Sequence, residues 1–131
     1  MNECTISGKI CSEPTSFLDK KGKHVYFTLA VQRTYARNRK KYDFIECRSH
    51  YKTAEFITAY FAYGNMIAVH GHMQTENGSD MNGNPRTNTY ILVSTAEFVE
   101  SKEQHEAKLK AAGKPIPTTS WNEDNERKED T

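Results

Sequence analysis

The sequence predicts an all-β domain with one helix, in which five strands close into a small barrel. Two observations carry this prediction. Apolar and polar residues alternate from Val25 to Val31 and again from Asp43 to His50, the pattern of strands with one buried face. Between the third and fourth expected strands, residues 53–63 instead place aromatic side chains at helical spacing.

The expected strands occupy residues 4–11, 25–31, 43–50, 66–74 and 89–99. Phe17 and Leu18 indicate a further short strand before a polar turn. In the expected helix, Thr53 is a candidate N-cap and Gly64 a candidate terminator. Residues 75–86 are rich in glycine and asparagine, which predicts a long hairpin loop. Five strands with a helix between strands 3 and 4 is the order of an OB-fold, a partly open Greek-key barrel.

Residues 101–131 differ in character from the first hundred residues. Residues 101–113 predict a short helix, capped by Ser101 and ended by Gly113, whose apolar face is too weak to dock firmly. The last eleven residues carry five acids and two bases, which predicts a disordered acidic tail. We therefore expect an OB-fold domain at 1–100 and a flexible acidic tail at 101–131. The candidate docking residues for a partner protein in this tail are Trp121, Glu123 and Asp124, unless Trp121 folds back onto the domain.

A basic, aromatic segment joins the second and third expected strands. From Arg33 to Tyr42 it holds five cations and two tyrosines, with no acid. Cations can follow a phosphate chain and flat rings can stack bases, which is what a binder of single-stranded nucleic acid needs. Phe44, a large ring on the face opposite Ile45, lies beside this segment. The ordinary alternatives are a solvated hairpin tip for the segment and, for Phe44, packing beneath a loop or a partner chain. The position of the segment favours binding, because OB-folds hold oligonucleotides across strands two and three.

Composition argues against several other classes of protein. The three cysteines form no CxxC pair, which favours reduced thiols in the cytoplasm over a disulfide framework or a zinc site. The first residues do not resemble a signal peptide, and no apolar run approaches the roughly 20 residues of a membrane helix. His70 and His72 share a strand face, but further metal ligands are not evident, so we expect a polar lining there.

No constellation of side chains indicates catalysis. Glu46 and Glu55 have no paired carboxylate in sight, and no glycine loop of the phosphate-cradling type occurs. Cys47 and His50 stand three residues apart on one strand, so they would face opposite sides. We therefore expect a protein that is not an enzyme and needs no cofactor.

Four segments, in this order and spacing, resemble the bacterial and phage single-stranded DNA-binding proteins over residues 1 to about 100. They are ISGKICSEP, FTLAVQRTY, DFIECRSHYKTAEF and YGNMIAVHGHMQT. The resemblance implies an OB-fold that coats single-stranded DNA without strong sequence preference during replication, recombination and repair. It also implies a homotetramer, with a dimer as the alternative, in the cytoplasm of a bacterial cell or an infected host. The departures from the family pattern favour a phage or mobile-element version.

The family stacks bases on rings at four places. The match puts Tyr35 at the first, Phe44 at the second and His50, a poorer stacking ring, at the third. The fourth falls near Gly78, where the ring is lost, and Tyr42 is a further candidate ring. The expected phosphate contacts are Arg33, Arg37, Arg39, Lys40, Lys41, Arg48 and Lys52. The family's acidic tail ends in a hydrophobic tip that recruits partners. This tail ends in Glu129, Asp130 and Thr131 without such a tip, so recruitment is expected either to be lost or to use Trp121.

Two other functions compete with this prediction. The chain could be a primosomal or recombination accessory protein that mainly contacts other replication proteins, which a dimer with weak DNA binding would favour. It could also be an OB-fold used mainly for protein contacts, which burial of Tyr35 and Phe44 at a subunit interface would favour.

Overall fold

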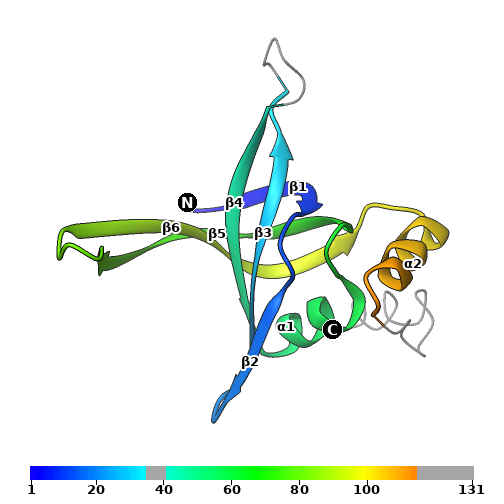
Figure 1. Cartoon of the computed structure of the whole chain (residues 1–131), viewed down its shortest axis with the longest axis horizontal. Coiled ribbons are helices and arrows are strands. Elements are labelled where there is room, and N and C mark those ends of the chain that lie inside the picture. The colour runs from blue at the N-terminus through cyan, green and yellow to red at the C-terminus, as the bar shows by residue number, and fades with distance from the viewer. Residues whose placement is uncertain (35–40, 115–131) are drawn as a thin grey trace.

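The computed structural model describes residues 1–34 and 41–114, which form six strands and two helices (Figure 1). The strands are β1 (Cys4–Ile10), β2 (Thr15–Asp19), β3 (Gly22–Gln32), β4 (Tyr42–His50), β5 (Met66–Ser79) and β6 (Pro85–Phe98). The helices are α1 (Tyr51–Tyr60) and α2 (Lys102–Ala111). None of the helices in these ranges is long and apolar enough to cross a membrane.

Five of the strands form a sheet that closes on itself. β1 pairs with β5, β5 with β6, β6 with β4 and β4 with β3, and β3 returns to β1 at Lys9–Ala30 and Ile10–Leu29. The pairing of β4 with β6 is parallel, with Cys47 opposite Ile91, and the others are antiparallel. Gly8 permits the closure, because a Cβ there would lie 2.6 Å from the carbonyl oxygen of Ala30. This is the Greek-key barrel of the predicted OB-fold.

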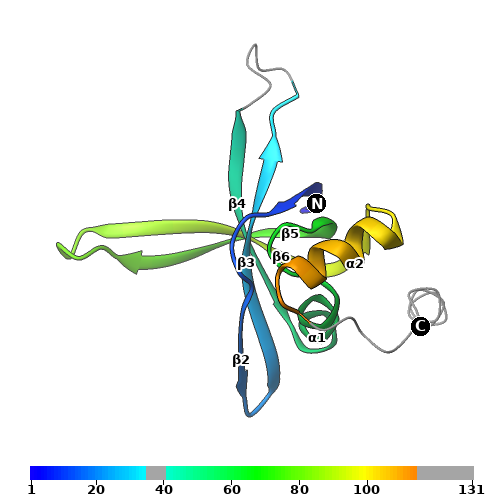
Figure 2. The same ribbon diagram turned by 45° about the vertical axis from the view of Figure 1, so that its right-hand side comes forward.

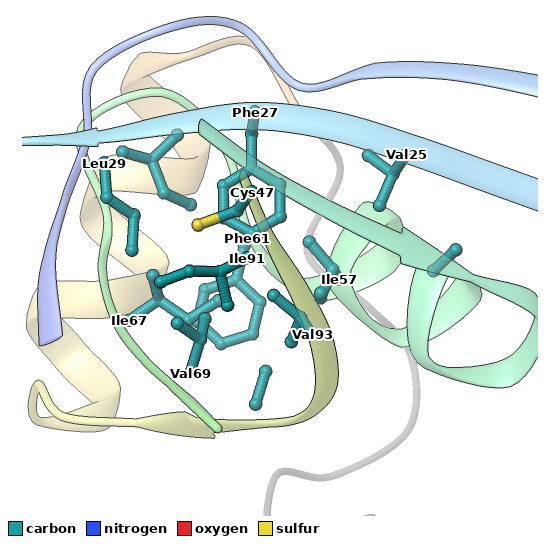
Figure 3. Packing of buried hydrophobic residues seen from close by; sticks show 13 residues of the cluster. Val25, Phe27, Leu29, Cys47, Ile57, Phe61, Ile67, Val69, Ile91 and Val93 are labelled. Atoms are coloured by element: carbon teal, nitrogen blue, oxygen red, sulfur yellow. The ribbon is translucent and has the colours of Figure 1, made fainter. Parts of the chain in front are cut away.

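The buried face of the barrel confirms the predicted alternation. Val25, Phe27 and Leu29 of β3 point inward and meet the buried Cys47 of β4. Figure 3 shows these side chains packed against residues of α1, its C-cap, β5 and β6, which are Ile57, Phe61, Ile67, Val69, Ile91 and Val93. Each fully buried aliphatic or aromatic side chain stabilises the fold by about 1.5–3 kcal/mol. Because the inner face is filled in this way, the alternate residues of β3 and β4 must face outward.

The prediction of five strands is wrong in number, because β2 adds a sixth. β2 pairs with the first half of β3, from Thr15–Tyr26 to Asp19–Gly22, and lies outside the closed ring. Helix α1 therefore lies between β4 and β5 of the six, and α2 follows β6. The short apolar pair at Phe17 and Leu18 was a sufficient signal for a strand. The full extent of β2 is set by its backbone hydrogen bonds to β3.

The predicted boundaries of α1 are also wrong. The helix begins at Tyr51, directly after β4, and Thr53 does not cap it, because its hydroxyl donates a hydrogen bond to the carbonyl of Ser94 at 3.0 Å. The strand turns into the helix without a loop because Tyr51 adopts a positive φ of 60°. The helix ends at Tyr60, and the amide of the C-cap residue Phe61 donates to the Ile57 carbonyl. Gly64 has a positive φ of 96° in the turn that follows.

Residues 75–86 form a two-stranded arm and not the predicted loop. β5 and β6 pair from Thr75–Thr89 to Ser79–Pro85 and project well beyond the barrel in Figures 1 and 2. The turn is confined to residues 80–84, where the side chain of Asp80 accepts hydrogen bonds from the amides of Asn82 and Asn84. Glycine and asparagine indicated a turn correctly, but the cross-strand pairing decided where it lies.

Helix α2 begins as predicted and docks more firmly than predicted. The hydroxyl oxygen of Ser101 accepts a hydrogen bond from the amide of Gln104 at 3.2 Å. His105 and Leu109 are each only 1% exposed, so the expectation of a weakly docked helix is wrong. The reason is that a polar residue shares the buried face, since the His105 ring bonds to the carbonyl oxygen of Tyr60. The predicted docking residues Trp121, Glu123 and Asp124 lie outside the described residues, and the acidic tail stays a prediction.

Candidate nucleic-acid interface

The outward face of β3 and β4 carries a row of side chains set by the strand register. Tyr26 lies opposite Arg48, Thr28 opposite Glu46, Ala30 opposite Phe44, and Gln32 opposite Tyr42. Directly opposed residues of antiparallel strands share a face of the sheet. The face therefore presents three exposed aromatic rings, those of Tyr26, Tyr42 and Phe44.

Phe44 is the most exposed of these rings, with 70% of its surface accessible. Its cross-strand neighbour is the small Ala30, which leaves the ring face open. A phenylalanine at this exposure gains little from burial, so packing beneath a described loop does not explain it. The geometry is that of a platform on which a planar ligand can stack.

An ion pair closes the base of the basic segment. Arg33 donates two hydrogen bonds to Oδ1 of Asp43, from Nε at 2.9 Å and Nη2 at 2.7 Å. These bonds raise the pKa of Arg33 and lower the pKa of Asp43. The amide of Arg33 also donates to the carbonyl oxygen of Lys41, whose side chain is exposed. Four of the predicted contacts, Tyr35, Arg37, Arg39 and Lys40, lie outside the described residues.

Arg48 is held between two rings and two carboxylates. Its guanidinium carbon lies 4.8 Å from the centroid of Tyr26 and 4.0 Å from that of Tyr90. Its Nη1 lies 2.7 Å from Oε2 of Glu76, and its Nε lies 3.0 Å from Oε1 of Glu46. The bonds to Glu76 are the main cause of its raised pKa. Because two carboxylates pair with its charge, Arg48 mainly fixes the positions of the neighbouring side chains on this face of the sheet.

His50 lies on the same face, and its ring is hydrogen-bonded to that of His24. Its Nδ1 lies 2.6 Å from Nδ1 of His24, and Nε2 of His24 lies 2.8 Å from Oδ2 of Asp19. Burial is the main cause of the lowered pKa of His50, followed by the charges of His24 and Arg48. The next residues, Tyr51 and Lys52, open α1 and are both exposed. The His50 ring thus has a fixed orientation at the edge of the face.

The structure adds aromatic residues that the sequence analysis did not select. Phe17 of β2 stacks on the His24 ring at a centroid distance of 5.0 Å. Tyr90 of β6 donates a hydrogen bond to Oε1 of Gln74 at 2.9 Å, and its ring lies against the Arg48 guanidinium. The outward position of Tyr26 follows from the alternation of β3 and was available from the sequence. Phe17 and Tyr90 reach this surface through strand pairings that no local pattern reveals.

The histidines of β5 make separate polar contacts. His70 Nδ1 lies 3.1 Å from the hydroxyl of Thr5, and His72 Nε2 lies 3.1 Å from the amide nitrogen of Gln74. Within residues 1–34 and 41–114, no cluster of three or more histidine, cysteine, aspartate or glutamate side chains is arranged to hold a metal ion. Burial raises the pKa of the Cys47 thiol to about 12, which makes it a poor nucleophile.

A closed Greek-key barrel with exposed rings beside a basic segment defines a nucleic-acid-binding OB-fold protein. Residues 1–99 match the Single-strand binding protein family, and the chain belongs to that family. It is therefore a single-stranded DNA-binding protein and not an enzyme.

Relatives of known identity agree with this assignment. The chain is similar to the single-stranded DNA-binding protein of Fusobacterium nucleatum, with 31% identity over 107 residues, covering 78% of this chain and 69% of the relative. It is also 31% identical over 108 residues to single-stranded DNA-binding protein 2 of Listeria monocytogenes, covering 80% of this chain and 68% of the relative. The crystal structure of a small single-stranded DNA-binding protein from Streptomyces coelicolor shares the fold, with a TM-score of 0.63 at 18% identity over 78% of this chain and 95% of that chain.

Proposed function

We propose that the chain coats single-stranded DNA by stacking bases on the outward face of β3 and β4 while cations beside that face hold the phosphates. The observation that carries the proposal is the exposed Phe44 ring beside the basic segment. A stacked base contributes about 1–3 kcal/mol and tolerates any sequence, because every base has a π-face. Tyr35, Tyr42 and Phe44 are the proposed main platforms, and His50 contributes as a ring at the edge.

The proposed phosphate contacts divide into two groups. Lys41 and Lys52 are exposed, and they belong with Arg37, Arg39 and Lys40 to the group that meets phosphates directly. Arg33 and Arg48 already bond to carboxylates, so a phosphate must displace Asp43 or Glu76 before it can pair with them. We therefore assign the salt dependence of binding mainly to the lysines and to the arginines of residues 37–39.

The biological setting is also a proposal. We infer a homotetramer that acts in the cytoplasm of a bacterial cell or infected host, with Trp121 and its acidic neighbours as the docking segment for replication or recombination proteins. A phage or mobile-element origin is supported by Gly78 and His50, which stand where the family has stronger stacking rings. Free Cys4, Cys11 and Cys47 suit a reducing compartment.

The test is a titration of the purified full chain with oligo(dT) and with a duplex of equal length. It is made at two salt concentrations while the mass in solution is measured. We expect tight binding to oligo(dT), weak binding to the duplex and weaker binding at the higher salt concentration. Equal or weak binding to both ligands would reject the coat function and favour an accessory protein that mainly contacts other proteins.

A further inference from the structure

A second two-stranded arm projects from the barrel at the end of β3 and β4 opposite to Gln32 and Tyr42. It consists of β2 and the first half of β3, and Figures 1 and 2 show it extending past α1. Phe17 lies opposite His24, and Thr15 lies opposite Tyr26. Tyr26 in turn shares a face with Arg48 and, four residues further along β3, with the Ala30–Phe44 pair. Phe17, Tyr26 and Phe44 therefore lie on one continuous face of the sheet.

The rings of Phe17 and Tyr26 each contact a neighbouring side chain and remain partly exposed. Phe17 is 44% exposed and Tyr26 is 36% exposed. Their centroids are 5.5 Å apart with an interplanar angle of 86°, and Phe17 rests on the His24 ring at an angle of 28°. Tyr26 is also held by the Arg48 guanidinium. The exposed part of the Phe17 ring therefore offers a surface on which a base can stack, beside the nearly perpendicular Tyr26 ring.

Several contacts hold the arm in position against the barrel. His24 bonds to His50 of β4 across the sheet. The Tyr51 ring packs against the turn so closely that a Cβ added to Gly22 would lie 2.9 Å from its Cδ1 atom. Asp19 closes the turn by accepting hydrogen bonds from the amides of Lys21 and Gly22. Together these contacts fix the arm relative to β4 and the start of α1.

The charge of the arm suits a polyanion. The exposed turn residues Lys20 and Lys21 stand at the far end of the row of rings, and Lys23 follows them on β3. The row runs from Phe44 to Tyr26 over about 13 Å and continues to Phe17 on the next strand. The arm itself carries three lysines against one acid, Asp19, and a single strand needs cations of this kind close to exposed rings.

We propose that the β2–β3 arm is an additional subsite for single-stranded DNA, in which one base stacks on Phe17 with the nearly perpendicular Tyr26 ring at its edge, and the adjoining phosphates meet Lys20 and Lys21. This inference rests on the proposed function, because it extends the path of the strand beyond Phe44. The subsite compensates for the ring that is lost near Gly78. It lengthens the stretch of DNA that one chain covers.

The test compares Phe17→Ala with Leu18→Ala. The two residues are neighbours on β2 and face opposite sides, and Leu18 is 77% exposed, so both changes remove an accessible apolar side chain. Affinity is measured for a series of oligo(dT) lengths at one salt concentration. We expect Phe17→Ala to weaken binding by about 5- to 20-fold for long oligonucleotides and to leave short ones unchanged. Leu18→Ala is expected to match the wild type at every length.

Two further variants make the outcome decisive. Phe17→Tyr is expected to restore binding, since it keeps the ring. Phe44→Ala is expected to weaken binding at all lengths. If Phe44→Ala weakens binding but Phe17→Ala behaves like Leu18→Ala, the arm subsite is rejected while the proposed function stands. Equal losses in Phe17→Ala and Leu18→Ala would also reject it. If neither Phe44→Ala nor Phe17→Ala changes affinity, the proposed binding face itself is wrong.

Discussion

The Nδ1 atoms of His24 and His50 lie 2.6 Å apart and join the β2–β3 arm to β4. At this distance only one proton fits between them, so one nitrogen donates and the other accepts. Nε2 of His24 lies 2.8 Å from Oδ2 of Asp19, so the carboxylate accepts a hydrogen bond from the other side of the His24 ring. A second proton would place two N–H groups face to face and break the contact.

We therefore expect the stability of the protein to fall as the solution is acidified below about pH 6.5. The pKa of His50 and that of His105 are both lowered from 6.5, mainly by burial. Because the unfolded chain binds these protons more readily, stability that is present above the unfolded pKa is lost as the pH falls through the lower folded values. Urea unfolding at steps between about pH 7 and about pH 5 measures this, above the range where most carboxylates titrate. The decline should be smaller in His50→Gln and in His105→Gln, and a flat wild-type profile would contradict the account.

Salt titrations should separate the contribution of ring stacking to DNA affinity from the contribution of charge. Phe44→Ala is expected to lower the affinity for oligo(dT) by about 5- to 150-fold with an unchanged salt slope, because it removes a ring and no charge. Lys41→Ala is expected to reduce the slope by about 0.7, the value for one phosphate contact with a single strand. Arg39→Ala and Lys40→Ala should behave like Lys41→Ala. Equal slopes in the ring and cation variants would contradict this division.

Arg48→Lys is expected to weaken the fold and to leave the salt slope almost unchanged. Lysine keeps the charge but cannot lie flat between Tyr26 and Tyr90 while bonding to both Glu46 and Glu76. The expected loss is about 1–2 kcal/mol in the free energy of unfolding, measured by urea denaturation. For Arg48→Met, a salt slope reduced as much as in Lys41→Ala would show that Arg48 contacts a phosphate directly.

Leu109→Ala is expected to lower the free energy of unfolding by about 2–4 kcal/mol, because Leu109 is buried where α2 meets the barrel. The exposed Leu18 provides the matched control, and Leu18→Ala should change stability by less than about 0.5 kcal/mol. Urea denaturation of both variants makes the comparison. Similar small losses would mean that α2 docks weakly in solution, as its amino-acid pattern predicted.

Removal of residues 115–131 is expected to leave the affinity for oligo(dT) unchanged or to raise it. The acids of this segment can compete with phosphates for the cations of the domain. The cut falls after Lys114, because its Nζ donates a hydrogen bond to the carbonyl oxygen of Phe61 at 2.6 Å. Titration of the shortened chain beside the full chain measures the effect. A large loss of affinity would place part of the binding site in the removed segment.

Local patterns predicted much of the fold and part of the site. The alternation of β3 and β4 placed Val25 and Phe27 inside and Phe44 outside, because side chains of a strand point to opposite faces in turn. The Ser101 cap was also predictable, because its hydrogen bond with Gln104 spans only three residues of the sequence. The extent of β2 and the arm of β5 and β6 were not predictable in this way. Their residues are exposed and mostly polar, so they carry no periodic signal.

The amino-acid sequence by itself determined the class of the fold, the faces of the central strands, the ring at Phe44 and the basic segment beside it. Only the tertiary structure decided which distant residues meet. His24 and His50 stand 26 residues apart, and Arg48 and Glu76 stand 28 apart. Such contacts depend on strand register and on the closure of the barrel. Those are set by the packing of the whole core, and a local pattern of side chains is compatible with many registers.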